Sequence, residues 1–248
     1  MIVSPPTQPL PRDKAGQIIY PVDNGEPLAN DTEHLTWITF LKNGLDDWFA
    51  NRTDVFVAAD LLWYPVEGRP DVSKAPDVMV VLDHPSGHRM SYKQWLEKER
   101  PPQVVFEFMS AGNTAAEMMD KLDFYSDAGC EEFYIYDYQR DTFRAYLRET
   151  PRHALSKVSA DENGCWSSSA LGVTFGLDSN GDLWVRRPDG RLMETQRQIW
   201  VRAEAESNRA EAEAQRAEAE AKRADEESQR AQRLAAKLRA LGIDPEAP

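Results

Sequence analysis

Residues 103–137 read QVVFEFMSAGNTAAEMMDKLDFYSDAGCEEFYIYD, and this stretch decides the fold class. Its two ends, QVVFEFM and EFYIYD, are short runs rich in Val, Phe and Tyr, which is typical of β-strands. Between them, Thr114-Ala-Ala-Glu117 has the pattern of a capping box that opens a helix, and Gly129 is placed to end it. The stretch therefore predicts a strand, a helix and a second strand in an α/β (α+β) fold.

The flanking sequence extends this pattern on both sides. Upstream, LTWITFLKNGLDDWF has helical apolar periodicity and predicts a helix that begins near Asn30–Thr32. DVFVAADLLWYP, DVMVVL and, downstream, TFRAYL read as further strands. DVMVVL and QVVFEFM are continuously apolar, so we expect them to be central strands covered on both faces. Past Arg148, the turns DSNGD and PDG predict β-hairpins packed on one edge of the sheet.

Composition divides the chain into four expected regions. Pro-rich residues 1–29 read as an arm on the domain surface, residues 30–193 as the folded domain, and residues 242–248 as a disordered tail. Residues 194–241 repeat Arg-Ala-Glu with a period of seven and predict a long helix with a stripe of small residues. That helix could pair as a coiled coil in a homodimer, or stand alone as a solvated single helix.

Charge and cysteine content limit the classes of function. Residues 1–193 carry 19 Lys and Arg against 30 Asp and Glu, a net of −11, which argues against strong nonspecific binding of nucleic acid. Two cysteines without a Cys-x-x-Cys motif favour a reducing compartment. The first residues lack the apolar region of a secretory signal, and no run is long enough to span a bilayer. We therefore expect a cytoplasmic protein without a membrane partner.

Three polar residues lie in strongly apolar surroundings: Asp77 in APDVMVV, Glu107 in QVVFEFM and Lys121 in AEMMDKLDFY. Burying an unpaired charge costs several kcal/mol, so such residues are usually paired or bound to metal. Carboxylates on two neighbouring strands could share one Mg²⁺ (or Mn²⁺), and the following helix could bring the lysine over the same end of the sheet. This set of residue types favours hydrolysis of a phosphodiester, with the lysine opposing charge in the transition state.

The segments DVFVAADLLWYPVEG, APDVMVV, PPQVVFEFMSAGN and EMMDKLDFYSDAGCEEFYIYD resemble the Uma2 (DUF820) family of restriction endonucleases, in the PD-(D/E)XK nuclease superfamily. The likeness covers roughly residues 17–193. Within the family, the chain is similar to the cyanobacterial-type members. It implies a restriction-endonuclease-like mixed β-sheet flanked by helices, with Asp77 as the Asp of the PD half-motif and Glu107 as the second acid. Where the superfamily has lysine, this chain has Met109. The pattern Glu117-x-x-x-Lys121-x-x-x-Tyr125 resembles family members that carry the lysine on the next helix.

Each candidate has a plainer alternative. Asp77 could cap the chain after Pro76, Glu107 could face solvent from an edge strand, and Lys121 could pair with Glu117 one helical turn away. Further residues could reach the site or have ordinary structural roles in caps, bulges and loops: Glu33, His34, Asp60, Ser110 and Tyr125. The basic side chains that could meet phosphates, or form solvated strand faces, are Arg144, Arg148, Arg186 and Arg187.

Two functions remain open from the sequence. The first is a Mg²⁺-dependent endonuclease that hydrolyses DNA, with RNA or another phosphodiester as an alternative substrate. The second is a nuclease-fold binding or scaffold protein that lacks strong catalysis and acts through its C-terminal helix. Met109 and the acidic domain favour the second function, whereas the trio of Asp77, Glu107 and Lys121 favours the first.

Overall fold

The structure is a computed structural model, and it describes residues 5, 6, 8–23, 25, 27–110 and 112–241. The expected tail at 242–248 lies outside the described residues, as does part of the expected arm (1–4, 7, 24 and 26). The chain forms two compact units, Met1–Glu194 and Thr195–Pro248, which are considered separately below.

The first unit is built on a six-stranded mixed sheet in the order β1-β3-β5-β6-β7-β8. β5 and β6 are parallel, and the other neighbouring pairs are antiparallel. The α/β fold expected from the sequence is confirmed. The bounds of these strands are β1 Val55–Ala58, β3 Val78–Leu82, β5 Val104–Met109, β6 Glu132–Asp137, β7 Thr142–Leu147 and β8 Ser156–Val158.

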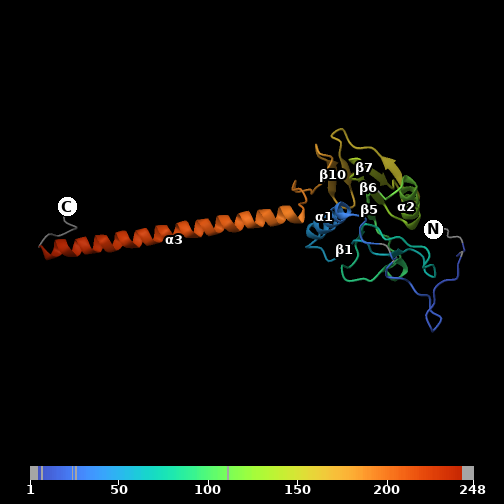
Figure 1. The fold of residues 1–248 in the computed structure, drawn as a ribbon, viewed down its shortest axis with the longest axis horizontal. Helices are drawn as coiled ribbons and strands as arrows, with labels where there is room; N and C mark the ends of the chain where they lie inside the picture. The colour runs from blue at the N-terminus through green and yellow to red at the C-terminus, as the bar shows by residue number, and fades with distance from the viewer. Residues whose placement is uncertain (1–4, 7, 24, 26, 111, 242–248) are drawn as a thin grey trace. The chain divides into compact units, whose positions relative to one another are not determined.

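Both faces of this sheet are covered, as the continuously apolar strands predicted. Alternate residues of β3, β5 and β6 face a cluster on one side that includes α1 (Thr32–Trp48), and the others face a cluster that includes α2 (Ala115–Ala128). Figure 1 shows the central strands with α2 on one side and α1 and β10 on the other. Side chains that alternate along a strand point to opposite faces, so Glu107 and Asp77 must both face α2.

α1 buries Trp37, Ile38 and Leu41 against the sheet, in line with its apolar periodicity. Leu35 belonged to the same periodic pattern but is 43% exposed. The residue that caps the helix is Asp31, whose carboxylate accepts the His34 backbone N–H at 2.7 Å. The sequence also allows Asn30, three residues before Glu33, to be read as the cap of this helix, but that reading is wrong because Asp31 occupies the cap position.

α2 has both halves of the predicted capping box. The Thr114 hydroxyl accepts the Glu117 N–H, and the Glu117 carboxylate accepts the Thr114 N–H. Gly129 ends the helix in the left-handed region with φ of 102°, which glycine adopts without the steric cost of a side chain. These two ends fix which turn carries Lys121 and Tyr125, and so which side chains face the sheet.

A separate three-stranded sheet, in the order β11-β10-β9, follows the main sheet in sequence. Its apolar residues, including Val173 and Phe175, belong to the same cluster as α1 and the central strands. The sequence placed these hairpins on one edge of the main sheet, and this expectation is wrong: they cover part of one face, because the ring of Phe175 packs against the rings of Phe106 and Tyr134. The strands are β9 Trp166–Ser168, β10 Val173–Leu177 and β11 Leu183–Arg186.

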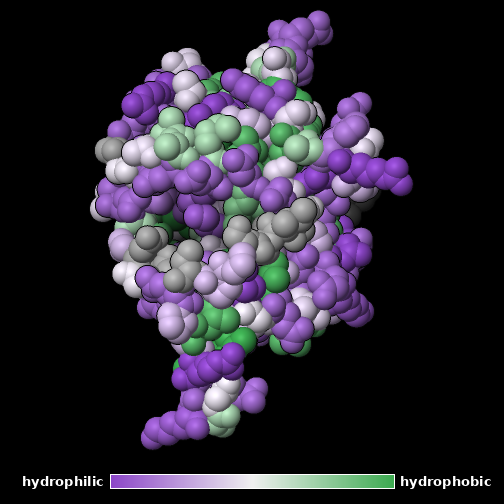
Figure 2. All heavy atoms as spheres, turned by 90° about the vertical axis from the view of Figure 1, so that its right-hand side faces the viewer, coloured by the Kyte–Doolittle hydropathy of each residue, from purple (hydrophilic) through white to green (hydrophobic). Residues whose placement is uncertain are grey.

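A short parallel pair lies between β1 and β5 in sequence. β2 (Trp63–Tyr64) pairs with β4 (Tyr92–Lys93), and a 3-10 turn (Gln94–Leu96) follows. The described part of the N-terminal arm contacts this region, since the Tyr64 hydroxyl donates to the carbonyl of Pro21. The face of the molecule in Figure 2 is mostly hydrophilic, with hydrophobic residues in small separate patches.

The second unit contains one 45-residue helix, α3 (Gln196–Ala240), none of whose residues is buried. Its stripe of small residues is flanked on both sides by rows of acidic side chains: Glu204, Glu211, Glu218 and Asp225 on one side, and Glu206, Glu213, Glu220 and Glu227 on the other. A homodimer joined along this stripe would bring like charges together, which is unfavourable. Within the described part of the chain, no helix has the length and apolar character needed to cross a membrane.

Candidate active site

The β3–β5 register brings the two predicted acids together. Val78 lies opposite Phe106 in this antiparallel pair, so continuing the register by one residue places Asp77 opposite Glu107. Directly opposed residues of an antiparallel pair project from the same face, here the face that α2 covers. The two strands were predicted from apolar runs in the sequence, and their observed pairing brings the two carboxylates together.

Glu107 is a carboxylate held inside the protein, with 1% of its surface exposed. Its Oε2 accepts a bond from the ammonium of Lys121 at 2.5 Å, and its Oε1 accepts a bond from the hydroxyl of Tyr125 at 2.5 Å. Burial, together with the negative charge of Asp77, raises the pKa of Glu107 to about 7 despite the opposing Lys121 ammonium. Two carboxylates and one ammonium therefore share a single small volume, which leaves excess negative charge.

Tyr125 keeps its proton in this setting. Burial, with the neighbouring Glu107 charge, raises the pKa of Tyr125 well above its ordinary value. Its hydroxyl is therefore a permanent hydrogen-bond donor that fixes one oxygen of Glu107. Tyr125 and Lys121 lie one turn apart on α2, so a single helix face supplies both groups that hold the carboxylate.

Asp77 is anchored through one of its two oxygens. Its Oδ2 accepts the backbone N–H of Phe108 at 2.7 Å and lies 3.1 Å from Nε2 of His34. The backbone N–H of Asn30 points at the other ring nitrogen, Nδ1, at 3.1 Å, so Nδ1 is the acceptor and Nε2 carries the proton. Burial lowers the pKa of His34, but the bond to Asp77 and its charge outweigh this and raise it overall.

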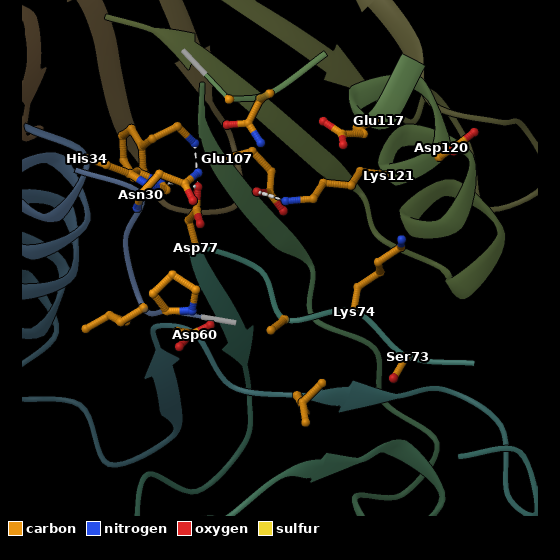
Figure 3. Close-up of a pocket in the computed structure, with 17 residues that line it drawn as sticks. Asn30, His34, Asp60, Ser73, Lys74, Asp77, Glu107, Glu117, Asp120 and Lys121 are labelled. Carbon is orange, nitrogen blue, oxygen red and sulfur yellow. Dashed lines mark hydrogen bonds and ion pairs between the residues drawn. The ribbon is translucent and has the colours of Figure 1, made fainter. Parts of the chain in front are cut away.

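A cavity of about 580 Å³ opens beside these residues. Figure 3 shows Asp77, Glu107 and Lys121 pointing toward one another, with Asp60 below them and Glu117 and Asp120 on α2. The polar lining residues are Asn30, His34, Asp60, Ser73, Lys74, Asp77, Glu107, Asn113, Glu117, Asp120 and Lys121. All three residues singled out from the sequence contribute to this one cavity.

The secondary candidates occupy different places. His34 bonds Asp77, Tyr125 bonds Glu107, and Asp60 lines the cavity from a left-handed backbone conformation with φ of 47°.

Ser110 is buried and accepts a bond from the Asn30 amide, which joins the loop after β5 to the start of α1. Glu33 is exposed in the first turn of α1, where an acid interacts favourably with the helix dipole, and is not among the lining residues.

Met109 occupies the position two residues after Glu107 where the superfamily pattern has lysine. It faces α2 as alternation predicts, and its sulfur accepts a contact from the Arg144 guanidinium at 2.7 Å. Nε of Arg144 is buried without a hydrogen-bond partner among the described residues. The ammonium next to Glu107 comes instead from Lys121, so a helix supplies the charge that Met109 cannot.

The other arginines considered for phosphate contact have structural partners. Arg148 donates to three backbone carbonyls around the end of α2, and Arg187 pairs with Asp47 of α1. Arg186 lies over the ring of Trp184 at 4.6 Å. Together with Arg144, none of them is among the described residues that line the cavity. Their contact with nucleic acid stays a prediction.

Lys74 and Asn30 are among the polar lining residues that were not singled out from the sequence as candidates for the site. Lys74 precedes Asp77 by three residues in VSKAPD, and Asn30 lies before the first helix, where the sequence marked only a cap. A polar residue just before the half-motif Pro76-Asp77 could have been noted as a neighbour of the site. Neither residue lies in an apolar run, which was the signal that identified the others.

The donor set fits a hard divalent cation that keeps several waters. Mg²⁺ and Mn²⁺ prefer carboxylate oxygens and are commonly held by one or two of them together with substrate phosphate. Oδ1 of Asp77 has no bond to any described residue, and the opposed Asp77 and Glu107 carry mutual repulsion that a cation would relieve. Among the described residues, no group of three or more His, Cys, Asp and Glu side chains is placed to hold a metal ion. Carboxylate oxygens, as donors, suit magnesium better than zinc.

Comparisons with known proteins agree with the sequence resemblance. Residues 9–180 match the family described as "Uma2: Putative restriction endonuclease". Among the solved structures that resemble the chain is a "putative nuclease belonging to DUF820" from Anabaena variabilis ATCC 29413, with 13% identity and a TM-score of 0.45. That match covers 65% of this chain and 86% of the other. No curated protein matches the chain.

Proposed function

The chain belongs to the Uma2 family, and we propose that it is an endonuclease that uses Mg²⁺ (or Mn²⁺) to hydrolyse phosphodiester bonds of DNA. The observation that carries the proposal is the pairing of Asp77 and Glu107 across β3 and β5, beside an ammonium from α2. In the proposed site, Asp77 and Glu107 hold the metal, and Lys121 assists the hydrolysis of the phosphodiester bond.

The metal, when bound, supplies a Lewis acid for the phosphate and makes a coordinated water more acidic. The chain's own residues orient the two carboxylates that would hold the metal. Tyr125 holds Oε1 of Glu107, while the Phe108 N–H and His34 hold Oδ2 of Asp77, so the carboxylates are oriented before substrate arrives. Such anchoring lowers the entropy lost on binding.

Lys121 has two roles in this proposal. Its ammonium lies 2.5 Å from Glu107 and offsets part of the negative charge that would otherwise repel a phosphodiester. It is 22% exposed, so it can also contact a substrate oxygen or the attacking water as charge develops. A helix-borne lysine thus takes the place that Met109 leaves without a cation.

A nicking assay on supercoiled plasmid, with Mg²⁺ or Mn²⁺ and with EDTA as control, tests the proposal. We expect cleavage that requires the metal and falls at least about 100-fold in Asp77→Ala and Glu107→Ala. Activity that survives either substitution would contradict the assigned mechanism. A parallel assay with RNA of the same sequence separates the two nucleic acids, since faster RNA cleavage would reassign the substrate.

Calorimetric titration with Mg²⁺ separates the enzyme from a non-catalytic scaffold. A nuclease of this design binds the ion, and the binding heat disappears in Asp77→Ala. Absence of metal binding together with absence of cleavage would favour the scaffold, which would then act through α3.

A further inference from the structure

The cavity contains many acids and few bases. Five carboxylates line it, but Lys74 and Lys121 are the only Lys or Arg side chains among the described lining residues. Lys121 is engaged with Glu107 at 2.5 Å, whereas Lys74 forms no ion pair with any described residue. The carboxylates are Asp60, Asp77, Glu107, Glu117 and Asp120.

The backbone of Lys74 is held firmly. Its carbonyl accepts the N–H of Trp63 at 2.8 Å, and its own N–H donates to the Trp63 carbonyl at 3.3 Å. Trp63 is fully buried, and its ring is parallel to that of Tyr125, with centroids 6.1 Å apart. The backbone of Lys74 is therefore tied through Trp63 to the same tyrosine that orients Glu107, which fixes where its side chain leaves the chain relative to the cavity.

Lys74 extends from the segment before β3 toward the side of the cavity formed by α2, as Figure 3 shows. It lies on the other side of the two acids from His34 and Asn30. The start of α2 also lines the cavity, but its Thr114–Glu117 capping box already uses two of its N–H groups and adds a negative charge. A helix start whose N–H groups are occupied by a capping box is a poor anion site, so a side chain has to bind the anion instead.

We propose that Lys74 is a substrate-binding residue of the cavity, whose ammonium contacts a phosphate oxygen of the nucleic-acid backbone. The inference rests on the proposed function and adds a specific group to it. A phosphodiester that enters beside five carboxylates meets repulsion, and Lys74 is the cation that is not already neutralised by Glu107. Contact with a backbone phosphate carries no base information, so Lys74 contributes affinity without sequence preference.

Lysine footprinting on the wild-type protein tests this contact without relying on cleavage. The protein is acetylated at low reagent concentration with and without a 20-base-pair DNA duplex, in Ca²⁺ and in EDTA, and each lysine is quantified by mass spectrometry. We expect Lys74 labelling to fall roughly fivefold with DNA in the Ca²⁺ arm at least, when most of the protein is bound. Lys157, exposed on β8 at the far edge of the sheet, is the internal control.

Substitution gives a second readout. Lys74→Ala should raise the KM for DNA about tenfold with a smaller change in kcat, and should reduce the slope of log KM against log salt by about 1. Lys74→Arg keeps the charge and should recover most of the affinity. Lys157→Ala should change neither quantity, and circular dichroism of each variant checks that the fold is retained.

The outcomes separate this inference from the proposed function. Cleavage that depends on Asp77, combined with no protection of Lys74 and a salt slope equal to that of Lys157→Ala, overturns the role of Lys74 alone. Protection of Lys74 by DNA in a protein that does not cleave supports the anion contact and removes the nuclease. An equal loss in Lys74→Arg and Lys74→Ala, without protection by DNA, would show a structural role and overturn the inference.

Discussion

Glu107 and Glu132 are two buried carboxylates on neighbouring strands of one sheet, and their surroundings differ in every respect that matters for chemistry. They lie on β5 and β6 with 1% and 4% of their surfaces exposed. Glu107 faces α2 and a cavity, whereas Glu132 pairs in register with Val104 and faces the opposite side, with α1 and the three-stranded sheet. Burial of an acid is therefore not sufficient to mark a site.

Both oxygens of the Glu132 carboxylate are hydrogen-bonded, and all of the donors are uncharged. Its carboxylate accepts bonds from the hydroxyls of Tyr134, Ser168 and Ser169 and from the backbone N–H of Ala170. These donors fix the loop between β9 and β10 to the main sheet. Glu107 instead shares its space with Asp77, a like charge, and with Lys121, beside an open volume. The comparison indicates that excess charge and access, more than burial, distinguish the acid proposed for the active site from the structural one.

The strongest test removes the structural acid. Glu132→Ala leaves several buried donors without an acceptor, so we expect the free energy of unfolding to fall by about 3–5 kcal/mol. Urea unfolding followed by near-ultraviolet circular dichroism measures the loss. Glu107→Ala is the matched variant and should lose less, because it also removes repulsion with Asp77. A greater loss in Glu107→Ala would break the comparison.

For cleavage activity we expect the opposite order, with the larger loss on substitution of Glu107 and the smaller on substitution of Glu132. Glu107→Gln keeps the side-chain volume but removes the charge, so nicking should fall at least about 100-fold while the free energy of unfolding changes by no more than about 1 kcal/mol. Glu132→Gln serves as the control, with its main effect on unfolding. If Glu107→Gln nicks plasmid at the wild-type rate, Glu107 is not the metal-binding acid.

Stability measured against pH, with EDTA present, probes Glu107 directly. Its pKa in the folded protein, about 7, lies above the ordinary value of 4.5, so the folded state binds more protons than the unfolded state between these values. The contribution of this group to stability is full below about pH 4.5 and declines as pH rises toward 7. We expect the wild type to lose on the order of 1–3 kcal/mol more than Glu107→Gln across this window. Parallel stability curves would contradict the raised pKa.

The smallest effects come from a matched pair of hydroxyls. Tyr125→Phe removes the donor to Glu107, and Tyr134→Phe removes a donor to Glu132. Each should lower the free energy of unfolding by about 1 kcal/mol. Tyr125→Phe should also reduce cleavage about tenfold, because an oriented ligand loses its support, while Tyr134→Phe leaves cleavage unchanged. Equal cleavage in the two variants would show that orientation of Glu107 by Tyr125 has no catalytic effect.

Much of the framework could be read from the chain because it depends on local patterns. Thr114, Glu117 and Gly129 marked the ends of α2 through interactions spanning only a few residues, and the structure has both ends where they were expected. The apolar runs around Asp77 and Glu107 identified central strands. Local propensity failed where packing decided, as for Leu35, which is exposed, and for the late hairpins, which cover a face instead of extending an edge.

What the sequence by itself determined is the set of residue types that can hold a metal and the periodicity that points Glu107 and Met109 to one face. Only the tertiary structure decided that the ammonium of Lys121 bonds Glu107, that the imidazole of His34 bonds Asp77, and that the backbone of Lys74 pairs with Trp63. The physical reason is that alternation and capping act over a few residues, whereas strand pairing and cavity walls join segments tens of residues apart. Glu132 shows the same limit, because its shell comes from residues 168–170, and no local pattern connects these positions.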